Sequence, residues 1–226
     1  MDNYYYRMEP KKTAFDFYTD NGGSIVAIAG EDFAVIGSDT RLSTNYSIYT
    51  REQSKLFPLS EKTVLGCSGC WCDTLQLNKV VKAQMQMYYH DNNKTMSTPA
   101  VSQMLSTMMY YKRFLPYLVY TVLAGLDTEG KGCVYSYDPI GHCERSMFRA
   151  GGSSGALLQP LLDNQLGYMN MEKVEKKPVS LERALAVLKD VFISAAERDI
   201  YTGDSIAIQI ITKDGVKSES FELRKD

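Results

Sequence analysis

The chain has 226 residues, of which 44% are hydrophobic, so it can bury at least one sizeable core. Its formal net charge is −2 at pH 7, a balance that gives no strong field toward nucleic acid or an anionic membrane. The longest apolar runs, such as residues 118–126, are far shorter than the roughly 20 residues that a membrane-spanning helix needs. We therefore expect neither nucleic acid nor a membrane as a partner.

The first 20 residues contain three consecutive tyrosines together with acidic and basic side chains. They have no apolar core and do not match a secretory signal. The chain has five cysteines, an odd number that favours reduced thiols and a location in the cytoplasm and nucleus. We expect residues 1–22 to form an N-terminal arm and residues 23–226 to form one domain, because no linker, repeat or low-complexity tract follows the arm.

Beyond the arm, stretches with strand-like composition alternate with stretches of helical periodicity. The predicted strands are 24–29, 33–38, 63–68, 118–126, 132–138, 144–150, 204–212 and 216–223. The predicted helices are 71–90, 99–113, 154–164 and 181–198. Thr98 and Ser180 are predicted N-caps, with Pro99 at the first helical position. The dipeptide Asp214-Gly215 predicts a hairpin between the last two strands.

The order of elements is strands, two helices, strands, two helices, strands. Consecutive strands joined by short turns pair antiparallel. Helices that come in pairs can cover the outer faces of two stacked sheets. The predicted fold class is therefore α+β, with two antiparallel sheets flanked by helices in a four-layer αββα sandwich.

Residues 151–155 match G-x-S-x-G, the nucleophile elbow of α/β-hydrolases, and lie between a predicted strand and a predicted helix. In that class of enzyme the histidine follows the serine. The histidines of this chain, His90 and His142, both precede Ser153. We therefore interpret the motif as a glycine-rich turn.

Cys67, Cys70 and Cys72 lie close together where a strand is predicted to meet a helix. A zinc or redox site would need further ligands, and Cys133 and Cys143 lie far along the chain in other strands. Small buried packing residues are the better interpretation. We expect no metal and no cofactor.

Another set of residues could serve hydroxyl chemistry. A hydroxyl nucleophile at a chain terminus can use its own amine as base, and a nearby lysine and carboxylates can hold that amine and lower the pKa of the hydroxyl. Asp39 and Lys55 could supply such partners, together with Asp199 and Thr202 from the last predicted helix-to-strand turn. The alternative is that these are ordinary surface or turn charges, and spacing alone favours that alternative.

Three long blocks occur in order at residues 30–43 (GEDFAVIGSDTRLS), 162–171 (LDNQLGYMNM) and 189–204 (KDVFISAAERDIYTGD). They resemble the β subunits of the proteasome, a family of N-terminal-nucleophile hydrolases, and the similarity extends over nearly the whole chain. The resemblance implies a four-layer sandwich. It also implies a place in a β ring of the 20S core particle, with other β subunits of the same ring and of the opposite ring, and α-ring subunits, as partners.

The resemblance also assigns site positions. Asp39, Lys55 and Asp199 match the charged groups around the active threonine of the family. Thr202 falls where active members carry a serine, and Gly203 matches the glycine that follows it.

Gly23 stands where the active members have their nucleophilic threonine, a departure that matches an inactive branch of the family. The resemblance therefore implies a non-catalytic structural subunit that completes the ring and lines the chamber of a particle degrading ubiquitin-tagged and unfolded proteins. The alternative is a peptidase that uses Ser24 after cleavage between Gly23 and Ser24. Successive side chains on a strand point to opposite faces, so we expect the Ser24 hydroxyl to point away from Lys55.

Overall fold

The computed structural model describes residues 18–169, 171–172 and 177–225. The part of the predicted N-terminal arm up to residue 17 lies outside the described residues.

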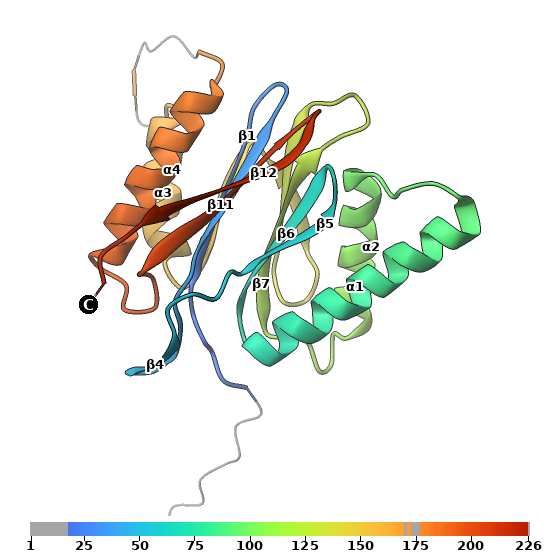
Figure 1. Ribbon diagram of the computed structural model, residues 1–226, viewed down its shortest axis with the longest axis horizontal. Helices are drawn as coiled ribbons and strands as arrows, with labels where there is room; N and C mark the ends of the chain where they lie inside the picture. Colours follow the sequence, from blue (N-terminus) through green and yellow to red (C-terminus); the bar gives the residue numbers. More distant parts are fainter. Residues whose placement is uncertain (1–17, 170, 173–176, 226) are drawn as a thin grey trace, which may run out of the picture.

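Two five-stranded antiparallel sheets form the centre of the domain (Figure 1). The first has the order β10-β1-β2-β11-β12 and the second the order β5-β6-β7-β8-β9. The strands of the first are β1 (Ser24–Ala29), β2 (Ala34–Asp39), β10 (Phe148–Gly152), β11 (Ser205–Thr212) and β12 (Gly215–Glu222). Those of the second are β5 (Leu56–Ser60), β6 (Thr63–Gly69), β7 (Val119–Leu126), β8 (Gly132–Tyr137) and β9 (Cys143–Ser146). A separate two-stranded ribbon contains β3 (Leu42–Thr44) and β4 (Ser47–Thr50).

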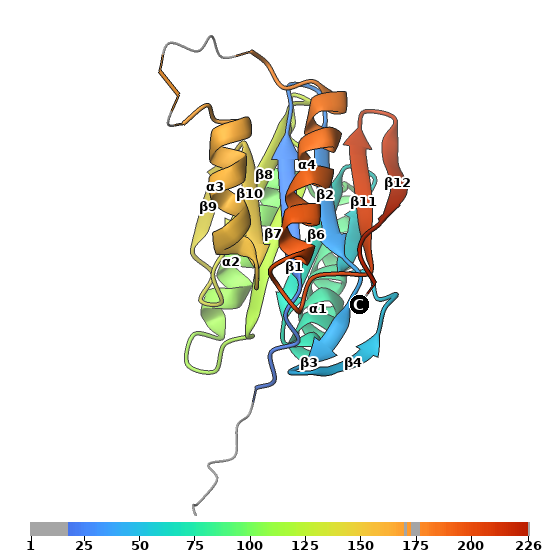
Figure 2. The same cartoon turned by 90° about the vertical axis from the view of Figure 1, so that its left-hand side faces the viewer.

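Helices cover the outer face of each sheet (Figures 1 and 2). α1 (Trp71–Asn92) and α2 (Thr98–Tyr111) pack on the second sheet, and α3 (Gly155–Gln165) and α4 (Leu181–Ala196) pack on the first. One apolar cluster lies between the two sheets and one lies between each sheet and its helices. The predicted four-layer αββα sandwich is confirmed.

α4 shows how the local sequence determines an element. Its apolar residues recur at helical spacing, and they form a buried stripe against the first sheet. The hydroxyl of Ser180 accepts a hydrogen bond from the Arg183 amide at 3.3 Å, as predicted for an N-cap. The other predicted N-cap is wrong: Ser97 occupies the N-cap position of α2 without a side-chain capping hydrogen bond, so Pro99 is the second helical residue and not the first. The hydroxyl of Thr98 instead donates to the carbonyl of Leu126 at 2.7 Å.

The single strand predicted at 144–150 is two strands that belong to different sheets. β9 ends at Ser146 and pairs with β8, whereas β10 begins at Phe148 and pairs with β1. Met147 lies between them, and its carbonyl accepts a hydrogen bond from the Ala29 amide at 2.6 Å. The prediction was wrong because a chain that crosses from one sheet to the next keeps its extended backbone and its strand-like composition.

Three strands between residues 42 and 60 were not predicted. β3 and β4 have only three and four residues, and β4 is largely exposed, so neither shows an apolar alternation. β5 contains Pro58, which has no amide donor, and lies at the edge of its sheet, where such a residue is tolerated.

The packing of α4 makes a direct prediction. Phe192 is completely buried against the first sheet, whereas its neighbour Ile193 is 43% exposed. Phe192→Ala is expected to lower the free energy of unfolding by about 3–5 kcal/mol. Ile193→Ala on the same helix is the control and is expected to change it by less than about 1 kcal/mol. Denaturant unfolding of the purified chain measures both, and equal losses would contradict this account of the core.

Candidate functional site

The residues predicted to form a site gather where the chain enters β1. The end of β2, the segment before β5 and the turn between α4 and β11 meet there, beside the β3–β4 ribbon (Figure 2). The site therefore draws on both sheets and on the loop that follows α4.

Asp39 and Lys55 form a buried ion pair. Their exposed fractions are 0% and 1%, and the Lys55 Nζ lies 2.9 Å from Asp39 Oδ2. Nζ also donates to the carbonyl oxygen of Asp39 at 3.1 Å and to that of Arg41 at 2.6 Å. All three ammonium protons are therefore used. The alternative that these are ordinary surface or turn charges is wrong for this pair.

The Asp39 carboxylate is surrounded by donors. It accepts hydrogen bonds from the amide of Ser24 at 2.8 Å and from the amide of Arg41 at 3.2 Å. Burial raises the pKa of Asp39 above its ordinary value, although the charge of Lys55 and these hydrogen bonds act against that rise. Without Lys55 the carboxylate would remain buried with only amide donors.

Gly23 faces this ion pair. A Cβ atom placed on Gly23 would lie 2.4 Å from Cε and 2.8 Å from Nζ of Lys55, and 3.0 Å from Oδ1 of Asp39. A side chain at position 23 would therefore point directly at the pair, and glycine supplies no hydroxyl there. The carbonyl oxygen of Gly23 accepts a hydrogen bond from the Ser153 amide at 2.9 Å.

The Ser24 side chain points the other way, as strand alternation predicts. Its hydroxyl is fully buried and forms hydrogen bonds with the hydroxyls of Ser154 and Thr202. Thr202 donates its single proton to Asp199 Oδ2 at 2.8 Å, so Ser24 must donate to Thr202, and Ser154 to Ser24. The result is a one-way chain of hydroxyls that ends on the Asp199 carboxylate.

Asp199 is the acceptor on this second side of the site. It accepts hydrogen bonds from the Ser153 hydroxyl at 2.6 Å and from the Tyr201 amide at 3.1 Å, in addition to the one from Thr202. The structure thus brings all the predicted residues together, but as two groups on opposite sides of the Gly23–Ser24 peptide. Lys55 and Asp39 lie on one side, and Asp199 and Thr202 lie on the other.

The role of Gly203 involves a residue that the sequence analysis did not single out. A Cβ atom on Gly203 would lie 2.5 Å from the Arg41 guanidinium, which crosses this position to reach Asp204. Nε of Arg41 lies 2.9 Å from Asp204 Oδ2, and both side chains are buried. Burial acts to raise the pKa of Asp204, but hydrogen bonds and charge from Arg41 and Arg51 outweigh it and hold that pKa below its ordinary value. The sequence does not show that Arg41 and Asp204 are buried together, so no sequence signal pointed to this pair.

Asn21 was also missed, because it lies in the predicted arm. Its amide donates to the Gly69 carbonyl at 3.0 Å, and its side-chain nitrogen donates to the Ser43 carbonyl at 3.1 Å. Its side-chain oxygen accepts a hydrogen bond from the Trp71 amide at 2.9 Å. Asn21 and Gly22 are buried, so the packed part of the chain begins at least two residues before Gly23.

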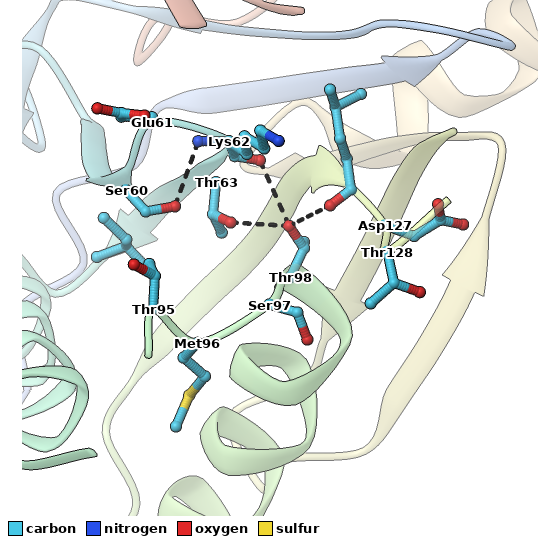
Figure 3. A pocket seen from close by; sticks show the side chains of 12 residues that line it. Ser60, Glu61, Lys62, Thr63, Thr95, Met96, Ser97, Thr98, Asp127 and Thr128 are labelled. Carbon is cyan, nitrogen blue, oxygen red and sulfur yellow. Dashed lines mark hydrogen bonds between the residues drawn. The ribbon is translucent and has the colours of Figure 1, made fainter. Parts of the chain in front are cut away.

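A pocket at the start of β6 is not part of this site. It has a volume of about 590 Å³ and lies among the turns where Thr98 forms hydrogen bonds with Thr63 and with main-chain carbonyls (Figure 3). β6 begins there at Thr63 and ends at Gly69, whose carbonyl accepts a hydrogen bond from the Asn21 amide. The pocket and the site therefore occupy opposite ends of the same strand.

Comparison with known proteins identifies the family. A family model described as a proteasome subunit matches residues 19–211. The chain belongs to the proteasome subunit family. It is 60% identical over 218 residues to proteasome subunit beta type-1 of Drosophila melanogaster, covering 96% of this chain and 93% of that protein.

More distant relatives cover similar shares of the chain. Proteasome subunit beta type-1 of Arabidopsis thaliana is 48% identical over 213 residues, which are 92% of this chain and 96% of that protein. Proteasome subunit beta type-6 of Saccharomyces cerevisiae is 43% identical over 226 residues, which are 96% of this chain and 94% of that protein.

Among the cysteines, Cys67 adjoins the Asp39–Lys55 group through its backbone, since its amide donates to the Lys55 carbonyl at 3.0 Å. Cys67, Cys70 and Cys133 are buried, Cys72 is exposed, and each cysteine is a free thiol. Within the described residues, no group of three or more His, Cys, Asp or Glu side chains is placed to hold a metal ion. Among the same residues, no helix is both long enough and apolar enough to cross a membrane.

The bonds of Asn21 predict a change in hydrogen exchange. Asn21→Ala removes the acceptor of the Trp71 amide and is expected to speed exchange at that amide, while the Thr74 amide, which donates to the Cys70 carbonyl, stays protected. Asn21→Asp keeps the acceptor and is expected to preserve the protection of Trp71. Exchange measured by mass spectrometry at residue resolution distinguishes the two, and equal exchange of Trp71 in all three chains would refute the role of Asn21.

The Arg41–Asp204 pair predicts a pH dependence. The pKa of Asp204 is lowered on folding, so the stability due to its charge is present above the unfolded pKa of about 3.9 and is lost as pH falls through the folded pKa. Asp204→Asn is expected to cost roughly 1.5–3 kcal/mol near pH 7 and progressively less below about pH 4. The control, Asp214→Asn in the exposed β11–β12 turn, is expected to change stability by less than about 0.5 kcal/mol. Denaturant unfolding across pH checks both, and a constant difference down to low pH would contradict the assignment.

Proposed function

We propose that this chain is a non-catalytic structural β subunit of the 20S core particle. One observation carries the proposal. Position 23 points at the buried Asp39–Lys55 pair, where a hydroxyl nucleophile would have to stand, and it is occupied by glycine. Relatives that cover nearly the whole chain are named proteasome subunit beta type-1, which supports a β subunit.

The neighbouring serine does not supply a replacement. In the uncut chain its nitrogen is a peptide amide that donates to Asp39 at 2.8 Å, and only cleavage of the Gly23–Ser24 bond would turn it into the free amine that such a nucleophile uses as base. Its hydroxyl lies on the opposite side of the chain from Lys55, within the hydroxyl chain that ends on Asp199. A peptidase that uses Ser24 would need both cleavage of the Gly23–Ser24 bond and a rotation of this residue.

The proposed partners are the other β subunits of the same ring and of the opposite ring, and the α-ring subunits. Such a ring closes only when every position is filled, because its contacts are heterologous. The chain offers large exposed apolar side chains of the type enriched at subunit interfaces, for instance in and after α2. These are Tyr110, Tyr111, Phe114 and Leu115. We further propose that the protein lies in the cytoplasm and the nucleus.

The test is to take the intact mass of this chain from the assembled particle and to label the particle with a peptide vinyl sulfone. We expect a mass that includes residues before Gly23 and no label on Ser24, while threonine-bearing β subunits of the same particle are labelled. A chain that begins at Ser24 and carries the label would overturn the proposal in favour of the serine peptidase, provided that Ser24→Ala abolishes the label. A free monomer in native extract would instead indicate a binding module outside the particle.

A further inference from the structure

We infer that Lys55 has taken over the space of the missing side chain, so that the site is closed and a hydroxyl restored at position 23 alone does not recover a nucleophile. The inference rests on the proposed function in taking position 23 as the lost nucleophile position. It goes further because it states that the residues around position 23 prevent a single substitution there from restoring a nucleophile.

The space itself is occupied. Carbon atoms in contact ordinarily lie about 3.5–4.0 Å apart, whereas a Cβ on Gly23 would lie 2.4 Å from Lys55 Cε. The same atom would lie 2.8 Å from Nζ. The end of the Lys55 side chain therefore overlaps the position that the Cβ atom of any larger residue at position 23 would take.

The ammonium group of a lysine can usually change position, but that of Lys55 is restrained by its hydrogen bonds. Nζ donates to Asp39 Oδ2, to the Asp39 carbonyl and to the Arg41 carbonyl, and the residue is 1% exposed. Each of these hydrogen bonds would have to lengthen or break before Lys55 could withdraw. A buried ammonium that loses partners without gaining water is strongly disfavoured.

The backbone adds a second constraint. Gly23 has φ of +94° and Gly22 has φ of +62°, which L-residues with a side chain rarely adopt. The peptide units cannot simply rotate, because the Gly23 carbonyl accepts from the Ser153 amide and the Ser24 amide donates to Asp39. A Cβ on Gly152 would lie 2.0 Å from the Gly23 carbonyl oxygen, so the opposite side of this peptide is also tightly packed.

The steric part of this account can be separated from the backbone part within the same chain. Gly215 has φ of +119°, and a Cβ there would meet nothing within 4 Å. Gly215→Ala therefore measures the cost of a positive φ alone. Gly23→Ala measures that cost together with the overlap with Lys55.

The experiment compares the two alanine variants by denaturant unfolding of the full chain. We expect Gly23→Ala to lower the folding equilibrium constant by about tenfold or more beyond the effect of Gly215→Ala, as overpacking does. Equal effects would overturn the inference. As a second measurement, Gly23→Ala is introduced into a Lys55→Ala chain, where the additional loss is expected to shrink to that of Gly215→Ala, and an undiminished loss would also overturn it.

A chemical readout completes the test. In the assembled particle, Gly23→Thr is expected to remain uncut before residue 23 and to stay unlabelled by the peptide vinyl sulfone. Cleavage and labelling of Gly23→Thr would overturn this inference while leaving the proposed function intact, as long as the unmodified chain remains inert. Labelling of the unmodified chain would instead refute the proposed function, so the two failures are distinguishable.

Discussion

The buried ion pair between Asp39 and Lys55 is the constraint on which the rest of the site depends. Removing two charges from water costs more than their attraction returns unless the remaining donors and acceptors are also paired. Here the three ammonium protons are taken by Asp39 and by the Arg41 carbonyl, and the carboxylate also accepts two amides. Satisfying the pair fixes the end of β2 and the start of β1 and β5, and with them the path of the chain through Gly23.

The same completeness holds on the other side of the Gly23–Ser24 peptide. Ser24, Ser154 and Thr202 are buried, and their protons run in one direction to Asp199. A reactive hydroxyl needs a partner that can accept its proton at the moment of attack, as well as an open approach for the substrate. The Ser24 hydroxyl has its proton already committed and no exposed surface. The hydroxyls of Ser24, Ser154 and Thr202 therefore form a buried network in which each proton already has an acceptor.

Elements governed by local sequence were predictable, and those governed by distant partners were not. The apolar stripe of α4 and the Asp214-Gly215 turn depend only on neighbouring residues, and both were located from the sequence. β3 and β4 are short, and β3 accepts hydrogen bonds from the distant side chain of Asn21. The proximity of Asp39, Lys55 and Asp199 was predicted from family resemblance. The spacing of residues so far apart in the chain does not by itself indicate that they meet in the fold. The burial of Lys55 was not predictable from its residue type, because lysine side chains are usually exposed.

The placement of the pocket and the ion pair at opposite ends of β6 has a consequence for how this molecule can change. Seven residues of strand separate the two ends by about 20 Å. Substitutions farther apart than about 7–10 Å, with no shared partner, usually contribute to stability independently. The end with the turns around Thr98 and the end with Gly23 are thus energetically uncoupled. A substitution at one end is therefore expected to leave the contribution of the other end to stability unchanged.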